Sequence, residues 1–76
     1  MVSTITMQEL YVIIGKRIAE KRQKRNLSQE HLAEITNLHR NYIGYIERGE
    51  KRATLDTLYQ ITKALNISLE WLFKGF

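Results

Sequence analysis

The sequence predicts an all-α fold, a compact bundle of five helices. Apolar residues recur at helical spacing along most of the chain, and no segment alternates apolar and polar residues for long enough to indicate a strand. The 76 residues contain no proline and only four glycines, so few positions interrupt a helix. A chain of this length is expected to form a single domain over residues 1–76.

The first two helices are indicated by an apolar stripe and a capping residue. Leu10, Ile14 and Ile18 recur at intervals of four residues, which predicts a helix from about Met7 to Lys24. A short second helix is expected to begin after Ser28, because serine is a favourable N-cap residue.

A sharp turn follows the second helix. Only about three residues, Asn37 to His39, separate it from the third, and asparagine tolerates the left-handed conformation that such a turn requires. Ala33 is small enough for two helix backbones to approach closely, and Leu38 and Ile43 flank the turn as apolar anchors. This spacing is typical of a helix-turn-helix, although a plain αα-hairpin would have the same spacing.

The last three helices are also bounded by capping residues. The third is expected over about Arg40–Arg48, where Gly49 ends it. The fourth is expected to begin after Thr54, and the fifth to open at Ser68 and end at Gly75.

The positive charge is concentrated in two segments. The chain carries a formal net charge of +4, with six basic residues and one acidic residue in 16–25 and four basic and two acidic residues in 40–52. A fold that joins these segments would present one basic face, which favours a nucleic-acid partner.

Several other functions lack the residues they need. Cysteine is absent, and His31 and His39 have no companion ligands, so we expect no metal site and no cofactor. No catalytic set, phosphate loop or ligand cleft is recognisable, so we expect neither an enzyme nor a small-molecule ligand. The longest apolar run, Tyr11–Ile14, is far shorter than the ~20 residues of a membrane span. With no signal peptide either, we expect a cytoplasmic protein without a membrane partner.

Four blocks of sequence resemble the Cro/phage-repressor type of helix-turn-helix regulators, the xenobiotic-response-element family, whose fold is lambda-repressor-like. The resemblance covers about residues 14–73, and residues 38–43 look most like the controller proteins of restriction–modification systems. The blocks occur in the family's order and spacing, and they are Leu27–Ala33, Asn37–Ile43, Ile46–Gly49 and Leu65–Leu72.

The resemblance implies a sequence-specific transcriptional regulator that binds double-stranded DNA, with the helix at 40–48 in the major groove. The residues expected to contact bases are Arg40, Asn41, Gly44 and Tyr45. Those expected to contact phosphates are Lys21, Gln29, His39, Tyr42, Arg48, Lys51 and Arg52. The alternatives are a phosphate contact for Arg40, packing for Tyr42 and Tyr45, and a solvated surface charge for each remaining arginine or lysine.

Two charged residues are expected to be structural. Arg22 continues the apolar stripe of the first helix by one more four-residue step, and Glu47 stands four residues after Ile43. Opposite charges on inward faces are expected to pair, because an unpaired buried charge is costly. The family has such a pair at the matching positions, which implies a clamp between the first and third helices. His39 departs from the serine or threonine common at the third N-cap, and we expect it to cap poorly.

The C-terminal segment is the expected dimer interface. Its apolar side chains, which could instead complete a small core, are Leu69, Leu72, Phe73 and Phe76. A homodimer would bind a near-palindromic operator. Residues 1–6 extend beyond the family pattern, and Val2 and Ile5 could fold onto the core, fold onto a partner, or fray. The alternative function is a protein-binding module, such as an antitoxin or adaptor, on the same scaffold.

Overall fold

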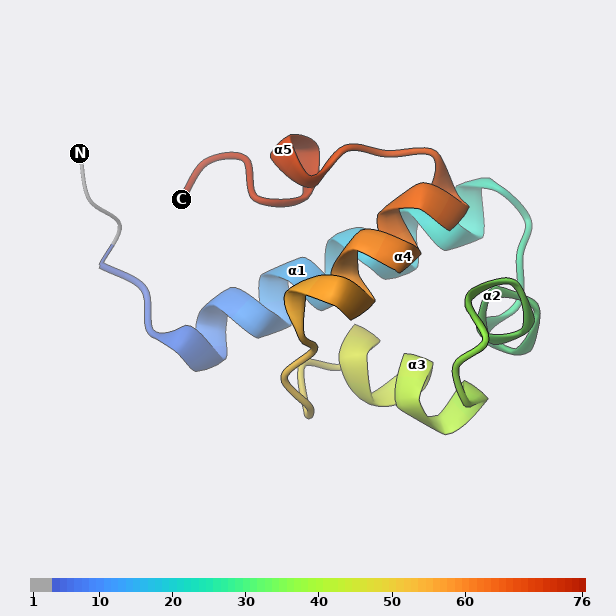
Figure 1. Cartoon of the computed structure of the whole chain (residues 1–76). Coiled ribbons are helices and arrows are strands. Elements are labelled where there is room, and N and C mark those ends of the chain that lie inside the picture. Colours follow the sequence, from blue (N-terminus) through green and yellow to red (C-terminus); the bar gives the residue numbers. More distant parts are fainter. Residues whose placement is uncertain (1–3) are drawn as a thin grey trace.

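A computed structural model describes residues 4–76, and this part of the chain contains helices and no strand (Figure 1). The all-α prediction is confirmed. The helices are α1 (Met7–Lys24), α2 (Gln29–Thr36), α3 (Arg40–Glu47), α4 (Leu55–Leu65) and α5 (Leu69–Leu72). Val2 lies outside the described residues, as do its two neighbours at positions 1 and 3.

The long helix α1 is the element around which the others are arranged. It packs against α3, α4 and α5, while α2 packs against α3 and α4. In Figure 1, α5 and α3 lie on opposite sides of α1, and α2 lies near the end of α1. None of the helices in residues 4–76 is long and apolar enough to cross a membrane.

A polar side chain caps the start of each helix by accepting a backbone N–H, as the predicted caps require. These N-cap residues are Thr6, Ser28, His39, Thr54 and Ser68. At the start of α1 the cap is reciprocal, because the Thr6 backbone N–H donates to Glu9 Oε1 at 3.0 Å. This hydrogen bond lowers the pKa of Glu9.

Asparagine ends or follows three of the helices in a left-handed conformation. Asn37 has the positive φ (57°) that the turn requires, and Asn26 and Asn66 adopt φ values of 58° and 56°. Asparagine adopts the left-handed conformation at a lower free-energy cost than most other non-glycine residues. A chain with four glycines can therefore still make sharp turns.

The end of α5 differs from the prediction. The helix stops at Leu72, three residues before Gly75, and the chain continues as a turn. Arg17 of α1 explains this end, because its Nη1 donates to the Leu72 carbonyl at 2.9 Å and the Trp71 carbonyl at 3.4 Å. A guanidinium therefore satisfies two carbonyls at the end of α5.

Buried aliphatic side chains from all five helices, with one from the segment between α3 and α4, form one core. Its members are Ile14, Ile18, Leu32, Ala33, Ile43, Ile46, Ala53, Leu58, Ile61, Leu65 and Leu72. Leu72 is 0% exposed, so the prediction that it lies in a dimer interface is wrong. The short α5 turns this side chain inward, where it completes the core.

The backbones of α1 and α3 approach closely at Gly15 of α1, a residue that no pattern in the sequence marks. A Cβ atom at this position would lie 2.3 Å from the Ile46 carbonyl oxygen and 2.5 Å from that of Glu47. Glycine therefore allows the backbone of α1 to rest directly on the last turn of α3.

We predict that Gly15→Ala destabilises the protein. Alanine favours a helix by ~1 kcal/mol over glycine, but the clash with two backbone carbonyls should cost more, with a net loss of about 1–3 kcal/mol. In thermal unfolding this corresponds to a fall in Tm of at least about 4 °C. Lys16→Ala, at the exposed neighbouring position, is the control and should change little. A Gly15→Ala variant as stable as the wild type would contradict the close approach.

Candidate nucleic-acid interface

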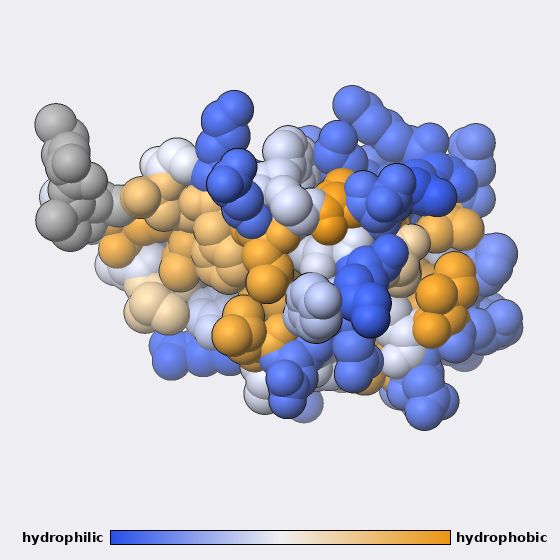
Figure 2. Space-filling view, turned by 45° about the horizontal axis from the view of Figure 1, so that its top comes forward, coloured by the Kyte–Doolittle hydropathy of each residue, from blue (hydrophilic) through white to orange (hydrophobic). Residues whose placement is uncertain are grey.

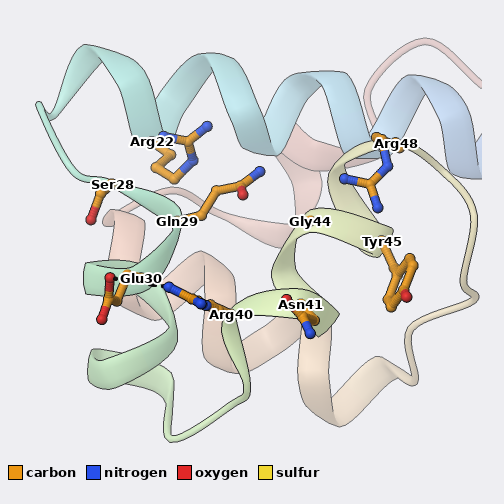
Figure 3. Close-up of a pocket in the computed structure, with 9 residues that line it drawn as sticks. All are labelled: Arg22, Ser28, Gln29, Glu30, Arg40, Asn41, Gly44, Tyr45 and Arg48. Atoms are coloured by element: carbon orange, nitrogen blue, oxygen red, sulfur yellow. Dashed lines mark ion pairs between the residues drawn. The ribbon is translucent and has the colours of Figure 1, made fainter.

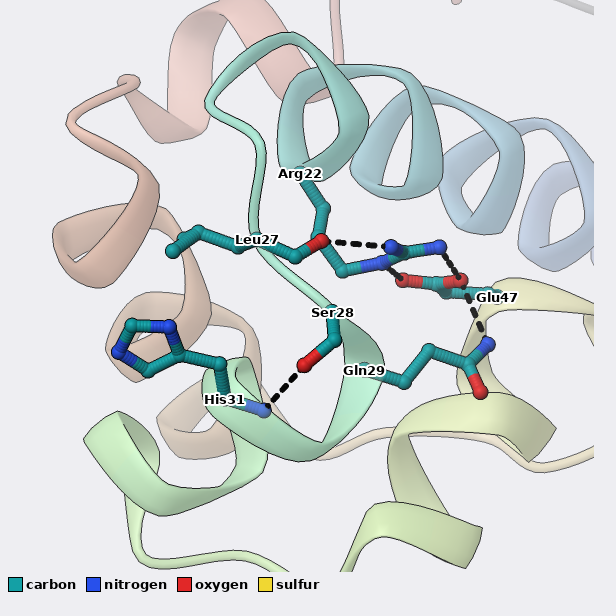
Figure 4. Close-up of polar contacts among 6 residues, drawn as sticks. All are labelled: Arg22, Leu27, Ser28, Gln29, His31 and Glu47. Atoms are coloured by element: carbon teal, nitrogen blue, oxygen red, sulfur yellow. Dashed lines mark hydrogen bonds and ion pairs between the residues drawn. The ribbon is translucent and has the colours of Figure 1, made fainter.

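A buried ion pair joins α1 to α3 (Figure 4). Arg22 Nε donates to Glu47 Oε2 at 2.6 Å and Arg22 Nη2 donates to Glu47 Oε1 at 3.0 Å, with the two side chains only 11% and 5% exposed. Arg22 Nη1 also donates to the Leu27 carbonyl at 2.8 Å. The structure thus brings Arg22 and Glu47 together as the helical spacing predicts, in a bidentate geometry.

Gln29, the first residue of α2, is attached to the same ion pair. Its Nε2 donates to Glu47 Oε1 at 2.9 Å, so one carboxylate links the beginning of α2 to the end of α1 and of α3. One of the two amide N–H groups of Gln29 is used within the protein and the other can still donate, so the phosphate contact of this side chain stays a prediction. The first-turn backbone N–H groups of α2 remain suited to an anion, because a helix leaves them without acceptors.

The exposed side of α3 begins at its N-terminus. Arg40 and Asn41 are both exposed, and Arg40 makes only a long pair of 3.7 Å with the equally exposed Glu30. His39 Nδ1 accepts the Asn41 backbone N–H at 3.0 Å, so the prediction of poor capping is wrong. Because Nδ1 accepts, the proton of the neutral ring sits on Nε2, which is then a donor.

A hollow of about 670 Å³ lies between the start of α2 and the exposed side of α3 (Figure 3). Arg40 from the start of α3 and Arg48 from its end both line the hollow and give it positive charge. We call its lining, apart from the buried Arg22 and Gly44, the α2–α3 face, defined as Ser28, Gln29, Glu30, Arg40, Asn41, Tyr45 and Arg48. Gln29 and Arg48 thus point to the same place, between the two helices.

The side chain of Arg48 contacts both a carboxylate and an aromatic ring. Its Nε donates to Glu50 Oε2 at 2.6 Å, and this hydrogen bond raises the pKa of Arg48. The guanidinium lies 5.2 Å from the Tyr45 ring centroid, and the Lys51 ammonium lies at the same distance from that ring. Two cations therefore lie close to the ring of Tyr45, and their attraction to the ring favours a fixed ring orientation.

Gly44 does not present the bare backbone that its predicted base contact requires. It is buried, and a Cβ there would lie 3.0 Å from Arg48 Nη1 and 3.6 Å from Gln29 Oε1. These two side chains cover the glycine, so its role here is to leave room for them.

The structure does not bring Lys21 to the α2–α3 face, so its phosphate contact stays a prediction that the geometry of this face does not support. Its ammonium lies 4.6 Å from the ring of Trp71 in α5, on the other side of α1 from α3. Successive residues of an α-helix are rotated by about 100° around its axis, so the side chains of Lys21 and the neighbouring Arg22 point in different directions.

The remaining predicted residues lie around α3. Tyr42 is half-buried and packs against the core, as the packing alternative for this residue expects. Lys51 and Arg52 are exposed after α3, and Arg52 lies 5.7 Å from the ring of Tyr11. Within residues 4–76, no group of three or more His, Asp or Glu side chains comes together as a metal site.

Comparison with known proteins gives consistent matches. The helix-turn-helix family matches residues 18–72. The control protein C.SmaI of Serratia marcescens is 46% identical over 65 residues, which cover 86% of this chain and 77% of that protein. The control protein C.BamHI of Bacillus amyloliquefaciens is 42% identical over 57 residues, covering 74% and 70%.

Solved structures of controller proteins have the same fold. The restriction-modification controller protein C.AhdI from Aeromonas hydrophila matches with a TM-score of 0.80 at 38% identity, covering 86% of this chain and 97% of that chain. The controller protein C.Esp1396I, as a tetramer in complex with its natural 35 base-pair operator, matches with a TM-score of 0.77 at 34% identity, covering 86% of each chain.

We predict that Glu47→Ala destabilises the protein by about 3–5 kcal/mol, because it leaves Arg22 buried without its partner. Urea unfolding measures this loss. The matched control is the double variant Arg22→Met with Glu47→Leu, which removes both charges and should cost less than the single substitution. A Glu47→Ala loss below about 1 kcal/mol, the range of exposed pairs, would contradict the structural role of this ion pair.

Proposed function

Because this chain belongs to the helix-turn-helix family, we propose that it is a transcriptional regulator that binds double-stranded DNA in a sequence-specific manner. The observation that carries the proposal is the α2–α3 face. It exposes Arg40 and Asn41 on the first turn of α3, next to the N-terminus of α2, and Arg48 from the other end of α3 lines the same hollow. Charged donors in this arrangement suit the edges of bases and the phosphates that flank them.

In the proposed complex α3 lies in the major groove, and its first turn reads bases. Arg40 has a forked guanidinium that fits O6 and N7 of guanine, while the Asn41 amide fits N6 and N7 of adenine. Tyr45 stands further along the same side of α3, where its ring can contact a thymine methyl group.

Phosphates on both sides of the groove would fix the position of α3. On one side, the first-turn N–H groups of α2 form an anion site, and the Nε2–H of His39 is a further donor. On the other side, Arg48, Lys51 and Arg52 follow α3 and supply positive charge. Such contacts set the register of the protein on the duplex.

We propose a homodimer that uses the C-terminal segment. Leu69 and Phe73 are half-buried and Phe76 is 36% exposed, so this segment keeps apolar surface after Leu72 has entered the core. Figure 2 shows apolar side chains gathered toward the end of the molecule at which α1 begins. A twofold dimer would place two copies of α3 in successive major grooves and would favour a near-palindromic operator.

The proposed regulator consists of one domain over residues 1–76, acts in the cytoplasm and has no catalytic role. Dimers bound at an operator would repress by excluding polymerase, and dimers bound at an upstream site would activate. The competing function is a protein-binding module, but the cores of protein interfaces are depleted in charge, whereas the α2–α3 face is rich in it. A protein-binding module should show no affinity for random duplex DNA at any salt concentration.

The experiment that tests the proposal is selection of bound duplexes from a random pool, followed by footprinting of the selected site. We expect a near-palindrome protected on one side of the duplex, with affinity that falls steeply as salt increases. Recovery of no preferred sequence would contradict sequence-specific regulation.

We predict that Arg40→Ala and Lys51→Ala weaken DNA binding in different ways. Arg40→Ala should cost about 1–3 kcal/mol at the selected site and relax the preference at one base pair. Lys51→Ala should weaken all duplexes by similar factors and reduce the salt slope by about 1. Fluorescence anisotropy over a series of salt concentrations measures both effects. Equal loss on all sequences for Arg40→Ala would make Arg40 a phosphate contact.

We predict that Phe76→Glu converts the dimer to a monomer without unfolding it. Phe76 is partly exposed and outside the core, so the substitution places a charge in the proposed interface at little cost to the fold. Sedimentation equilibrium should show a fall from twice the monomer mass to the monomer mass. Ile35→Glu, at an exposed position on α2, is the control and should remain dimeric. A dimeric Phe76→Glu variant would place the interface elsewhere.

A further inference from the structure

An exposed carboxylate stands beside the α2–α3 face. Glu50 Oε2 accepts the 2.6 Å hydrogen bond from Arg48 Nε, and the Glu50 backbone N–H donates to the Tyr45 carbonyl at 2.8 Å. A negative charge at this place repels DNA phosphates and offsets part of the charge of Arg48. Affinity for DNA alone therefore does not explain why the chain has a carboxylate here.

The backbone that carries Glu50 is fixed by packing. Gly49 adopts φ 73°, and a Cβ at this position would lie 2.8 Å from the Cα atom of Val12 in α1. Gln8 Nε2 also donates to the Gly49 carbonyl at 3.0 Å. The turn that directs Glu50 back to Arg48 is thus held against α1.

Arg48 is consequently restrained before any ligand binds. Nε is occupied by Glu50, the guanidinium lies beside the ring of Tyr45, and Nη1 lies over Gly44, where it helps to line the hollow. The terminal amino groups remain to donate to an acceptor in that hollow. An arginine held in this way loses less side-chain entropy on binding than a free one.

We propose that Glu50 is a positioning residue for sequence-specific DNA binding, which holds Arg48 so that its terminal amino groups meet a phosphate of the correctly registered duplex. This inference rests on the proposed function. A non-specific complex depends on positive charge alone and is weakened by Glu50. A registered complex depends on the position of its donors and is strengthened by Glu50. Glu50 therefore increases the ratio of specific to non-specific affinity.

The test compares two affinities for each variant by fluorescence anisotropy, one for the selected site and one for a random duplex of the same length. Glu50→Ala should bind the random duplex more tightly and the selected site more weakly, so that the ratio falls by about three- to fivefold, the upper range for an exposed ion pair such as this one, in which the two side chains are 53% and 51% exposed. Glu50→Gln should retain most of the ratio, because its amide oxygen can still accept from Arg48 Nε. Glu20→Ala, an exposed position on α1, changes the net charge equally and should leave the ratio unchanged.

A double-mutant cycle tests whether Glu50 acts through Arg48. In an Arg48→Ala background, Glu50→Ala should leave the ratio unchanged within about twofold. The same loss of ratio in that background would overturn the inference, as would a Glu50→Ala variant whose two affinities rise equally. If the wild type discriminates between the duplexes and Glu50→Ala discriminates as well, only this inference fails. If the wild type binds no duplex, the proposed function fails with it.

Discussion

The ion pair between Arg22 and Glu47 is the interaction on which the arrangement of the first three helices depends. Glu47 is the last residue of α3, Arg22 lies in the last turn of α1, and Gln29 opens α2. Rotation of α3 would separate buried charges at a cost of several kcal/mol. Together with the buried Ile43 and Ile46, the pair therefore favours one side of α3 facing the core, and Arg40 and Asn41 at the opposite end of the helix are exposed.

Local signals in the sequence were sufficient for the starts of the helices and for the inward faces of Arg22 and Glu47, while the family resemblance supported their pairing. Polar residues such as Ser28 and Thr54 stand immediately before apolar periodic segments, and capping depends only on neighbouring backbone groups. Asn37 has a conformation that only a few residue types adopt easily. Arg22 and Glu47 follow apolar residues at the helical interval, which places their side chains on inward faces regardless of the rest of the fold.

Other features depend on how the helices pack and could not be read from local pattern. Whether Leu72 points to the core or to a partner depends on where a four-residue helix docks, and Lys21 turns toward Trp71 only because α5 lies on that side of α1. Gly15 in a helical segment indicates lower helix propensity and nothing about a neighbour. The hydrogen bond from the Gln29 amide to a buried carboxylate likewise depends on how α2 and α3 pack.

One arginine forms a structural ion pair while others are proposed to contact DNA, and the arginine side chains themselves allow the most direct test of this arrangement. Nitrogen-15 NMR can follow the Nε–H signals of arginine during titration with the selected duplex. We expect the Arg22 signal to stay in place, because its bond to Glu47 persists in the complex, while the signals of Arg40 and Arg48 move. Movement of the Arg22 signal, with those of Arg40 and Arg48 unchanged, would contradict this division between a structural arginine and contacting ones.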